Sequence, residues 1–170
     1  DVVYHLAAVV SVRKTEEDVL KTLNVNIDGT KNVLDTCVTN KVKKIIFTST
    51  SEVYGSPTIV PISENNPLDP LSPYAASKII CEEYIKAYNK KFGLNYTIVR
   101  GFSAYGPGQS NDFVISNFVR RSLSNEPLLI HGDGSQIRSF CHIEDFVSFL
   151  FSALTNGDNE VFNIGNDKEP

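Results

Sequence analysis

Short apolar runs alternate along the chain with longer stretches in which apolar residues recur every three or four positions. The runs Val2–Ala7, Ile45–Thr48 and Tyr96–Val99 are rich in β-branched residues, as β-strands are. Leu128–Ile130 and Val161–Ile164 are two further strand candidates. Because each of the first three runs is followed by a helical pattern, the chain is predicted to form an α/β fold with a parallel sheet.

Helical periodicity predicts several helices, and one of them has clear boundary signals. Ser72 is a favourable N-cap, Pro73 suits the first turn of a helix, and Gly93 is a stop signal. The predicted helices are Asn24–Asn40, Pro73–Phe92, Phe113–Ser124 and Glu144–Leu154.

The two ends of the chain and two internal segments stand out. Val2–Ala7 is almost continuously apolar, as in a strand buried on both faces of a parallel sheet, and the chain stops soon after Val161–Ile164. We therefore expect a fragment that lacks residues at both ends. Gly55–Pro73 and Tyr105–Asp112 are rich in proline or glycine and are predicted to be loops, which in compact domains are commonly functional or disordered.

Composition and charge exclude several classes of function. The 170 residues are 41% hydrophobic and 21% charged, with a net charge of −4 and a pI near 5.4, as in an ordinary globular domain. No block of Lys and Arg suggests a nucleic-acid surface, and no apolar run approaches the ~20 residues of a membrane helix. The cysteines Cys37, Cys81 and Cys141 lack metal-site spacing. We expect buried, reduced thiols, a cytoplasmic location, and no metal.

Tyr74 and Lys78, in "SPYAASK", are candidates for acid/base chemistry. Residues four apart on a helix lie on the same face. A tyrosine has a pKa of ~10, and a neighbouring ammonium is expected to lower it by favouring the phenolate. The bare pattern also arises by chance in many helices, where it forms an ordinary surface.

A cluster of hydroxyl side chains follows the strand predicted at Ile45–Thr48. In "IIFTSTSEVYG" the apolar run leads into Thr48, Ser49, Thr50 and Ser51. Ligands bind beyond the carboxyl ends of strands in open parallel sheets, so these hydroxyls are placed to contact a substrate oxygen. The alternative is a turn whose hydroxyls cap their own backbone.

Taken together, the motifs resemble the extended short-chain dehydrogenase/reductases, in their NAD-dependent epimerase/dehydratase group, of which UDP-glucose 4-epimerase is the best-known member. The resemblance covers nearly the whole chain, in order. The motifs are "VVYHLAA", "NVNIDGTKNVLD", "FTSTSEVYG", "SPYAASK", "VRGFSAYGPGQ", "PLLIHGDGSQIRSF", "HIEDF" and "VFNIG".

The resemblance implies a Rossmann-like, doubly wound parallel sheet. Residues 1–104 would be the C-terminal part of the NAD-binding domain, including the catalytic helix. Residues 105–170 would mix segments of a small substrate-binding region with late Rossmann elements. The cofactor would be NAD, the substrate a nucleotide sugar, and the protein a homodimer paired through Asn24–Asn40 and Pro73–Phe92 in a four-helix bundle.

The resemblance also implies roles for particular residues. Tyr74 would be the catalytic base and acid, Lys78 would lower its pKa and bind the nicotinamide ribose, and Thr50 would bridge the sugar hydroxyl and Tyr74. The cofactor would be contacted by Leu6, Ala7, Ala8, Asn26 and Phe102, together with Tyr74 and Lys78.

Substrate contacts are implied for a second set. Arg138 would bind the diphosphate, because a planar guanidinium suits paired oxygens. Ser103 occupies a position where many relatives carry asparagine. The backbone near Leu129–His131 would lie by the nucleotide base. Arg100 is interpreted as structural, and the three histidines, His5, His131 and His142, as non-catalytic.

The chain also departs from the family. The glycine-rich turn that binds the dinucleotide pyrophosphate is missing; "GPGQSN" and "GDGSQI" each lack the third glycine. The chain would therefore begin at the family's fourth strand, and alone it is expected to bind NAD poorly.

Three functions remain open. A 4-epimerase is the first hypothesis. Thr50-Ser51-Glu52 resembles GDP-mannose dehydratases and UDP-glucuronate decarboxylases, so Glu52 is a candidate second acid/base for a dehydratase or decarboxylase. A non-enzymatic dinucleotide-binding protein is the third possibility, which the presence of Thr50, Tyr74 and Lys78 disfavours.

Overall fold

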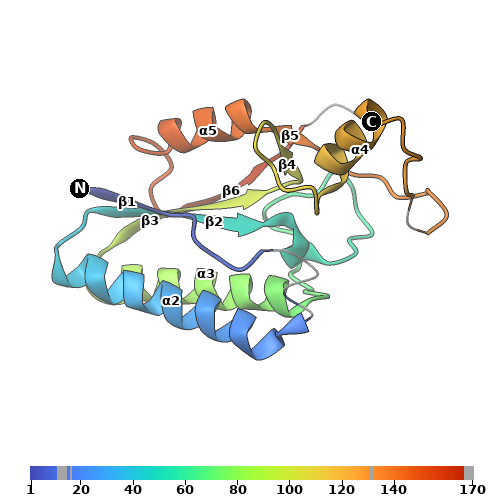
Figure 1. Ribbon diagram of the computed structural model, residues 1–170. Coiled ribbons are helices and arrows are strands. Elements are labelled where there is room, and N and C mark those ends of the chain that lie inside the picture. Colours follow the sequence, from blue (N-terminus) through green and yellow to red (C-terminus); the bar gives the residue numbers. More distant parts are fainter. Residues whose placement is uncertain (11–14, 16, 131, 167–170) are drawn as a thin grey trace.

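A parallel four-stranded sheet forms the centre of the molecule (Figure 1). The structure is a computed structural model of all 170 residues, and it describes residues 1–10, 15, 17–130 and 132–166. Strands β1 (Val2–His5), β2 (Lys44–Thr50), β3 (Asn95–Gly101) and β6 (Glu160–Ile164) lie side by side in that order. Each neighbouring pair is parallel, so the carboxyl ends of all four strands lie at the same edge.

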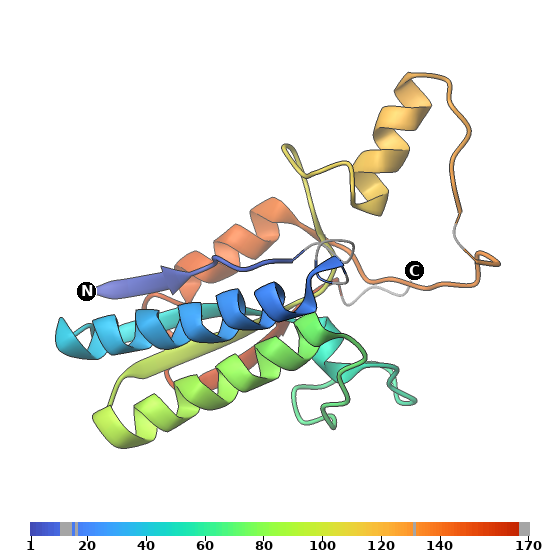
Figure 2. The same ribbon diagram turned by 60° about the horizontal axis from the view of Figure 1, so that its bottom comes forward.

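Two long helices cover one face of the sheet. Helices α2 (Val19–Thr39) and α3 (Pro73–Phe92) run next to each other across it (Figure 2). Every second side chain of a strand points to the same face of the sheet. The inward residues of the two helices pack against the side chains on this face. The buried members of this core are Leu34, Cys37, Ile45, Phe47, Cys81, Ile85, Leu94, Tyr96 and Ile98.

Helix α5 (Ile143–Ser152) covers the opposite face (Figure 1). Its Leu150, with Ala153 just beyond its end, packs on Ile46 and Val99 of the central strands. Helices on both faces make the sheet doubly wound, which confirms the predicted fold class.

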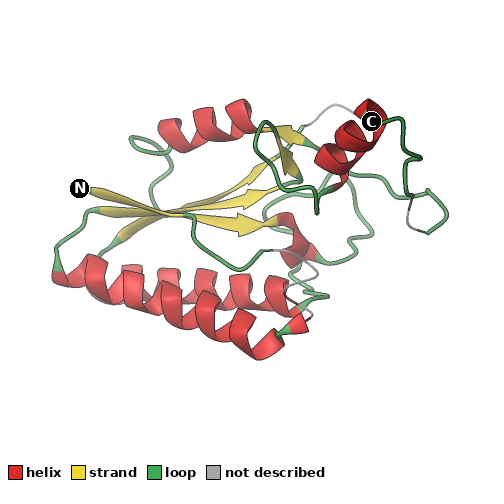
Figure 3. Ribbon diagram, viewed as in Figure 1, coloured by secondary structure: helices red, strands yellow, loops and turns green. Residues whose placement is uncertain are grey.

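The segment between β3 and α5 extends beyond the carboxyl edge of the sheet. The short strands β4 (Ala104–Tyr105) and β5 (Cys141–His142) pair in parallel. Helix α4 (Val114–Leu123) has no buried residue and lies apart from the main layers (Figures 2 and 3). A single 3-10 turn, η1 (Ser51–Tyr54), follows β2 directly.

The boundaries of α3 follow the local signals of the sequence. The Ser72 hydroxyl accepts a hydrogen bond from the Ala75 N–H, and Pro73 stands at the first helical position. Gly93 ends the helix in the left-handed conformation, at φ 71°, which glycine adopts without steric penalty. The predicted range Pro73–Phe92 is confirmed.

The other elements differ from prediction in instructive ways. Helix α2 begins before Asn24, because the Asp18 carboxylate caps it by accepting from the Lys21 N–H. The strand predicted at Leu128–Ile130 is wrong. In the structure these three residues are irregular and exposed, and their apolar side chains are not buried as those of a sheet strand would be. The three cysteines are buried free thiols, as predicted.

The described residues contain neither a candidate membrane span nor a candidate metal site. None of their helices combines the length and apolarity that a membrane crossing requires. Nor do these residues contain a group of three or more His, Cys, Asp or Glu side chains that could hold a metal ion.

Candidate active site

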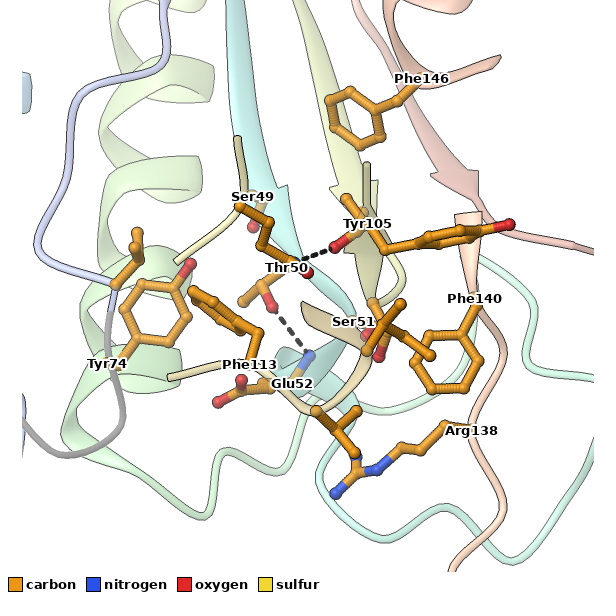
Figure 4. A pocket seen from close by; sticks show the side chains of 17 residues that line it. Ser49, Thr50, Ser51, Glu52, Tyr74, Tyr105, Phe113, Arg138, Phe140 and Phe146 are labelled. Atoms are coloured by element: carbon orange, nitrogen blue, oxygen red, sulfur yellow. Dashed lines mark hydrogen bonds between the residues drawn. The ribbon is translucent and has the colours of Figure 1, made fainter. Parts of the chain in front are cut away.

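A cavity of about 450 Å³ opens at the carboxyl edge of the sheet, where β2 and β3 end (Figure 4). Five of the predicted site residues line it: Thr50, Glu52, Tyr74, Ser103 and Arg138. They come from β2, η1, α3 and the two chain segments beside the β4–β5 pair. The fold therefore gathers residues that are up to 88 positions apart, from Thr50 to Arg138, around one space.

Thr50 is held by the turn that follows it. It is the last residue of β2, only 8% of its surface is exposed, and its Oγ1 accepts a hydrogen bond from the Glu52 N–H at 3.2 Å. That bond uses an acceptor site of the hydroxyl and leaves its hydrogen available as a donor. The same hydroxyl interacts with the phenol of Tyr74 and lowers the pKa of that phenol.

Tyr74 lies in the first turn of α3 and faces the cavity beside Thr50 and Glu52 (Figure 4). The pKa of its phenol is nevertheless raised above the ordinary value, first by burial and second by the negative charge of Glu52. The expected lowering by Lys78 is therefore not what the structure gives. Burial disfavours the charged phenolate, and the hydrogen bond with Thr50 offsets only part of that effect.

Lys78 lies one turn further along α3 and is 2% exposed. Its ammonium is 5.9 Å from the centre of the Tyr74 ring and 4.6 Å from that of Phe47. Among the described residues, its hydrogen bond goes to the Thr48 carbonyl at 2.7 Å. Burial lowers the pKa of Lys78 to about 8, while Cys81 and Glu82 act in the opposite direction.

Glu52 brings a negative charge to the wall of the cavity. Burial of the carboxyl raises its pKa, while a hydrogen bond from Ser72 and the positive charge of Arg138 lower it. The Ser72 contact is long, at 3.5 Å, and Glu52 as a whole residue remains exposed. Glu52 thus faces the same cavity as Tyr74. Within the part of the chain that the structure describes, only a long hydrogen bond from Ser72 and the charge of Arg138 stabilise its carboxylate form.

The side chain of Asn26 is hydrogen bonded within the protein. It is buried, and its amide makes three hydrogen bonds: with the Val9 N–H, the Val9 carbonyl and the Ser77 hydroxyl. Because the amide is thus occupied by the protein, it holds the segment after β1 in place and ties it to α3. A role of Asn26 toward a cofactor would run through the backbone of Val9.

The other predicted cofactor residues lie around the cavity without lining it. Leu6 and Ala7 are exposed and Ala8 is half-buried, just beyond the end of β1. Phe102 follows β3, and its N–H donates to the Ile164 carbonyl at 2.8 Å. All four follow the carboxyl ends of β1 and β3, as their motifs imply, and their neighbours Val10, Gly101 and Ser103 line the cavity.

Several aromatic residues in the cavity wall were not singled out by the sequence. Tyr105, Phe113, Phe140 and Phe146 all line it, and the rings of Tyr105 and Phe140 meet edge to face at 6.1 Å. Their only sequence signal is position, since Tyr105 and Phe113 flank the Gly/Pro-rich loop at the carboxyl edge. Their convergence depends on the β4–β5 pairing, which has no recognisable pattern.

Three of the residues interpreted as structural or non-catalytic, Arg100, His5 and His142, lie outside the cavity lining. Arg100 is buried against Glu82. His5 is buried and hydrogen bonded to Thr30, and burial together with the Lys78 charge lowers its pKa. His142 caps α5, with its Nδ1 accepting from the Glu144 N–H. His131 lies outside the described residues.

Comparison with known proteins identifies the family. The sequence model described as the NAD dependent epimerase/dehydratase family matches residues 1–165. The chain belongs to this family. A putative UDP-glucose 4-epimerase of Methanocaldococcus jannaschii is 40% identical over 99% of the chain and 56% of that protein. A dTDP-D-glucose 4,6-dehydratase of Dictyostelium discoideum is 38% identical over 99% of the chain and 42% of that protein.

Solved structures of family members have the same fold. A UDP-glucose 4-epimerase of Thermotoga maritima, determined with UDP-glucose, superimposes with a TM-score of 0.96 at 35% identity. That match covers 98% of this chain and 56% of the epimerase. A UDP-glucuronic acid 4-epimerase of Bacillus cereus, in complex with UDP-glucuronic acid and NAD, gives a TM-score of 0.92 at 37% identity. It covers 99% and 55% of the two chains.

The chain thus spans about half the length of the relatives it matches. Those relatives include epimerases, dehydratases and decarboxylases of nucleotide sugars. Membership in this epimerase/dehydratase family explains why the eight motifs occur in one order.

The described residues fit a nicotinamide cofactor at the edge of the site. Lys78 has three N–H donors, of which the Thr48 carbonyl engages one among the described residues. A buried ammonium with donors to spare suits the hydroxyl oxygens of a ribose. Beside it, the segment 6–10 is anchored by Asn26, and its alanines leave the backbone open to close approach.

Proposed function

We propose that the protein is an NAD-dependent nucleotide-sugar 4-epimerase, in which Tyr74, Lys78 and Thr50 carry the acid/base chemistry. The observation that supports this most directly is the convergence of the Tyr74 phenol, the Thr50 hydroxyl and the Glu52 carboxyl on one cavity in an epimerase-family fold. The buried ammonium of Lys78 lies behind them.

The residues act as follows in this proposal. Tyr74 takes the proton of the sugar hydroxyl at C4, directly or through Thr50, and later returns it. NAD, when bound, supplies the chemistry of accepting a hydride from that carbon and giving it back. Lys78 favours the phenolate of Tyr74 by its charge and binds ribose hydroxyls. Leu6, Ala7, Ala8 and Phe102 flank the cofactor, while Arg138 and Ser103 bind the diphosphate side of the substrate.

The raised pKa of Tyr74 sets a condition on this scheme. Burial and Glu52 both favour the protonated phenol, so Tyr74 needs a positive charge beside it to act as a base. Lys78 is the buried cation nearest to its ring among the described residues, at 5.9 Å from the ring centre.

Substitution of Tyr74 tests the proposal. Tyr74→Phe removes the phenol oxygen but keeps the ring, and we expect the conversion of UDP-glucose to UDP-galactose to fall by about 10²–10⁴-fold. Tyr88→Phe, on the same helix but outside the cavity lining, is the control and should retain wild-type turnover. Undiminished turnover in Tyr74→Phe contradicts the assignment.

A dehydratase or decarboxylase is the second candidate, and the position of Glu52 favours it. This carboxyl faces the cavity with a raised pKa, so it is suited to hold and move a proton at a carbon next to the oxidised one. Glu52→Gln distinguishes the two. An epimerase should keep turning over, whereas a lyase should lose its unsaturated or decarboxylated product, identified by mass spectrometry.

We propose further that the protein is a cytoplasmic homodimer. The outward side of the α2–α3 layer exposes Leu20, Val25 and Ile80, which are 72%, 47% and 41% accessible, and a second copy of the same layer would cover them as a four-helix bundle. We also propose the division into a nucleotide-binding part, residues 1–104, and a part with substrate-binding segments, residues 105–170.

A further inference from the structure

A buried ion pair lies directly behind the cavity. The Glu82 carboxylate on α3 and the Arg100 guanidinium on β3 are 0% and 3% exposed. Arg100 binds both oxygens of Glu82: Nη2 donates to Oε2 at 2.7 Å and Nε to Oε1 at 3.1 Å. This two-pronged contact fixes the angle between the two groups as well as their distance.

The pair also holds the strand that carries Thr50. The Ser49 hydroxyl donates to Glu82 Oε1 at 2.5 Å. Ser49 is 7% exposed, borders the cavity and immediately precedes Thr50. Glu82 is one helical turn beyond Lys78 and two beyond Tyr74. A single carboxylate therefore connects the end of β2 to the face of α3 that carries the acid/base residues.

The remaining donors of Arg100 hold the loop after η1. Its Nη1 donates to the Tyr54 hydroxyl at 2.8 Å and to the Glu64 carbonyl at 3.1 Å. Tyr54 in turn donates to Asn163 of β6 at 2.7 Å, and the Asn163 N–H donates to the Glu64 carboxylate at 2.8 Å. The loop between η1 and α3 is thus tied to the same guanidinium.

From this geometry we propose that Arg100, Glu82 and Ser49 form a positioning unit for the reaction. They set the placement of Thr50 and Glu52 relative to Tyr74 and Lys78, and they hold the 55–72 loop beside them. None of the three acts on substrate. The inference rests on the proposed function, because it concerns the geometry of that same site.

The need for core stability alone does not explain such a unit. Apolar residues of similar volume often replace a buried ion pair with no loss of stability, and each face of this sheet already carries a cluster of buried apolar side chains. Unlike apolar packing, the hydrogen bonds of the pair have a fixed geometry and so hold their partners at defined positions. Each of its bonds runs to a segment that carries or flanks a cavity residue.

An ion pair of Lys44, at the other end of β2, provides a control. Lys44 is 4% exposed, donates to the Ala153 and Asn156 carbonyls and forms an ion pair with Asp158 at 2.6 Å. Asp158→Asn therefore removes an ion pair of the same strand at the amino edge of the sheet, whereas the cavity lies at the carboxyl edge.

The experiment compares Arg100→Lys, Ser49→Ala and Asp158→Asn in the protein with its cofactor. Arg100→Lys keeps the charge but loses the planar fork. We expect kcat for the nucleotide sugar to fall about 10²-fold, with KM within about twofold of wild type, because misplacement by about 1 Å has that effect on rate. Ser49→Ala should lower kcat about tenfold. Asp158→Asn should lower the melting temperature and leave kcat unchanged.

Hydrogen–deuterium exchange provides a readout that needs no turnover. In Arg100→Lys and Ser49→Ala, the amides of Glu52 and of the 55–72 loop should exchange faster than in wild type, while those of α2 should not change. In Asp158→Asn the amides at the cavity should be as protected as in wild type.

The outcomes separate the two proposals. Wild-type kcat and wild-type exchange in folded Arg100→Lys and Ser49→Ala overturn the positioning unit, even if Tyr74→Phe is inactive. An active Tyr74→Phe overturns the proposed function, and the exchange data then still decide whether the unit orders the cavity. Should Arg100→Lys fail to fold, Ser49→Ala alone carries both measurements.

Discussion

Tyr74 and Lys78 lie one helical turn apart, yet burial shifts their pKa values away from the charged forms of both. The pKa of Tyr74 is raised and that of Lys78 is lowered to about 8. Each side chain is removed from water, and this desolvation is the largest cause of both shifts. The chemistry of the pair is thus set by its surroundings.

The lowered pKa of Lys78 predicts a pH dependence of stability. Above about pH 8 the folded protein has lost this proton, whereas the unfolded chain keeps it to about pH 10.4. Because the unfolded state then binds more protons, stability rises with pH across this window. Relative to Lys78→Met, the free energy of unfolding of the wild type should increase by roughly 2 kcal/mol between about pH 7 and about pH 10.

Urea denaturation of both proteins across this range measures the effect. Lys31→Met, which removes an exposed lysine on α2 that pairs with Asp35, is the control for the loss of one positive charge. A pH-independent difference between wild type and Lys78→Met would mean that Lys78 titrates at an ordinary value.

In helices α2 and α3, the effect of a glycine on stability depends on whether it lies within the helix or at its end. Gly29 and Gly93 show the contrast. Gly29 lies within α2, where a Cβ atom would meet no other atom within 4 Å, and Gly93 closes α3 at φ 71°. The same substitution is therefore favourable at one position and unfavourable at the other.

We predict that Gly29→Ala raises the free energy of unfolding by about 0.5–1 kcal/mol, because alanine has the higher helix propensity. Gly93→Ala should lower it by about 1–2 kcal/mol, because a Cβ atom is strained in the left-handed conformation. Denaturant titrations of the two variants side by side test both signs. Equal effects would show that the backbone at Gly93 relaxes on substitution.

At the scale of the whole molecule, the outer side of the α2–α3 layer is the surface through which we propose that two copies pair. Ile80 projects from the middle of α3 and is 41% exposed, and Phe151 on the opposite face of the sheet is 65% exposed. If α2 and α3 pair with a second copy, Ile80→Arg buries an unpaired charge, which is costly. We expect this variant to be monomeric in sedimentation equilibrium.

Phe151→Arg is the matched control, because it introduces the same charge on the other side of the sheet. It should sediment like the wild type. If Ile80→Arg remains dimeric, the two molecules associate through another surface and the four-helix bundle is wrong.

The amino-acid sequence by itself determined the alternation of strands and helices, the ends of α3, the free state of the cysteines and the family. These features depend on local periodicity, on caps such as Ser72 and Gly93, and on motifs in a fixed order, all of which act over a few neighbouring residues. Local signals also misled, as at Leu128–Ile130, where an apolar run is exposed and forms no strand.

Only the tertiary structure decided how the cavity is walled, how Asn26 is used, and in which direction the pKa of Tyr74 moves. Each of these results depends on groups distant in sequence: the aromatic residues of the β4–β5 region, the backbone of Val9, and the carboxyl of Glu52. The desolvation of a group and the hydrogen bonds available to it depend on which atoms surround it in space. The periodicity of residues along the chain does not identify those atoms.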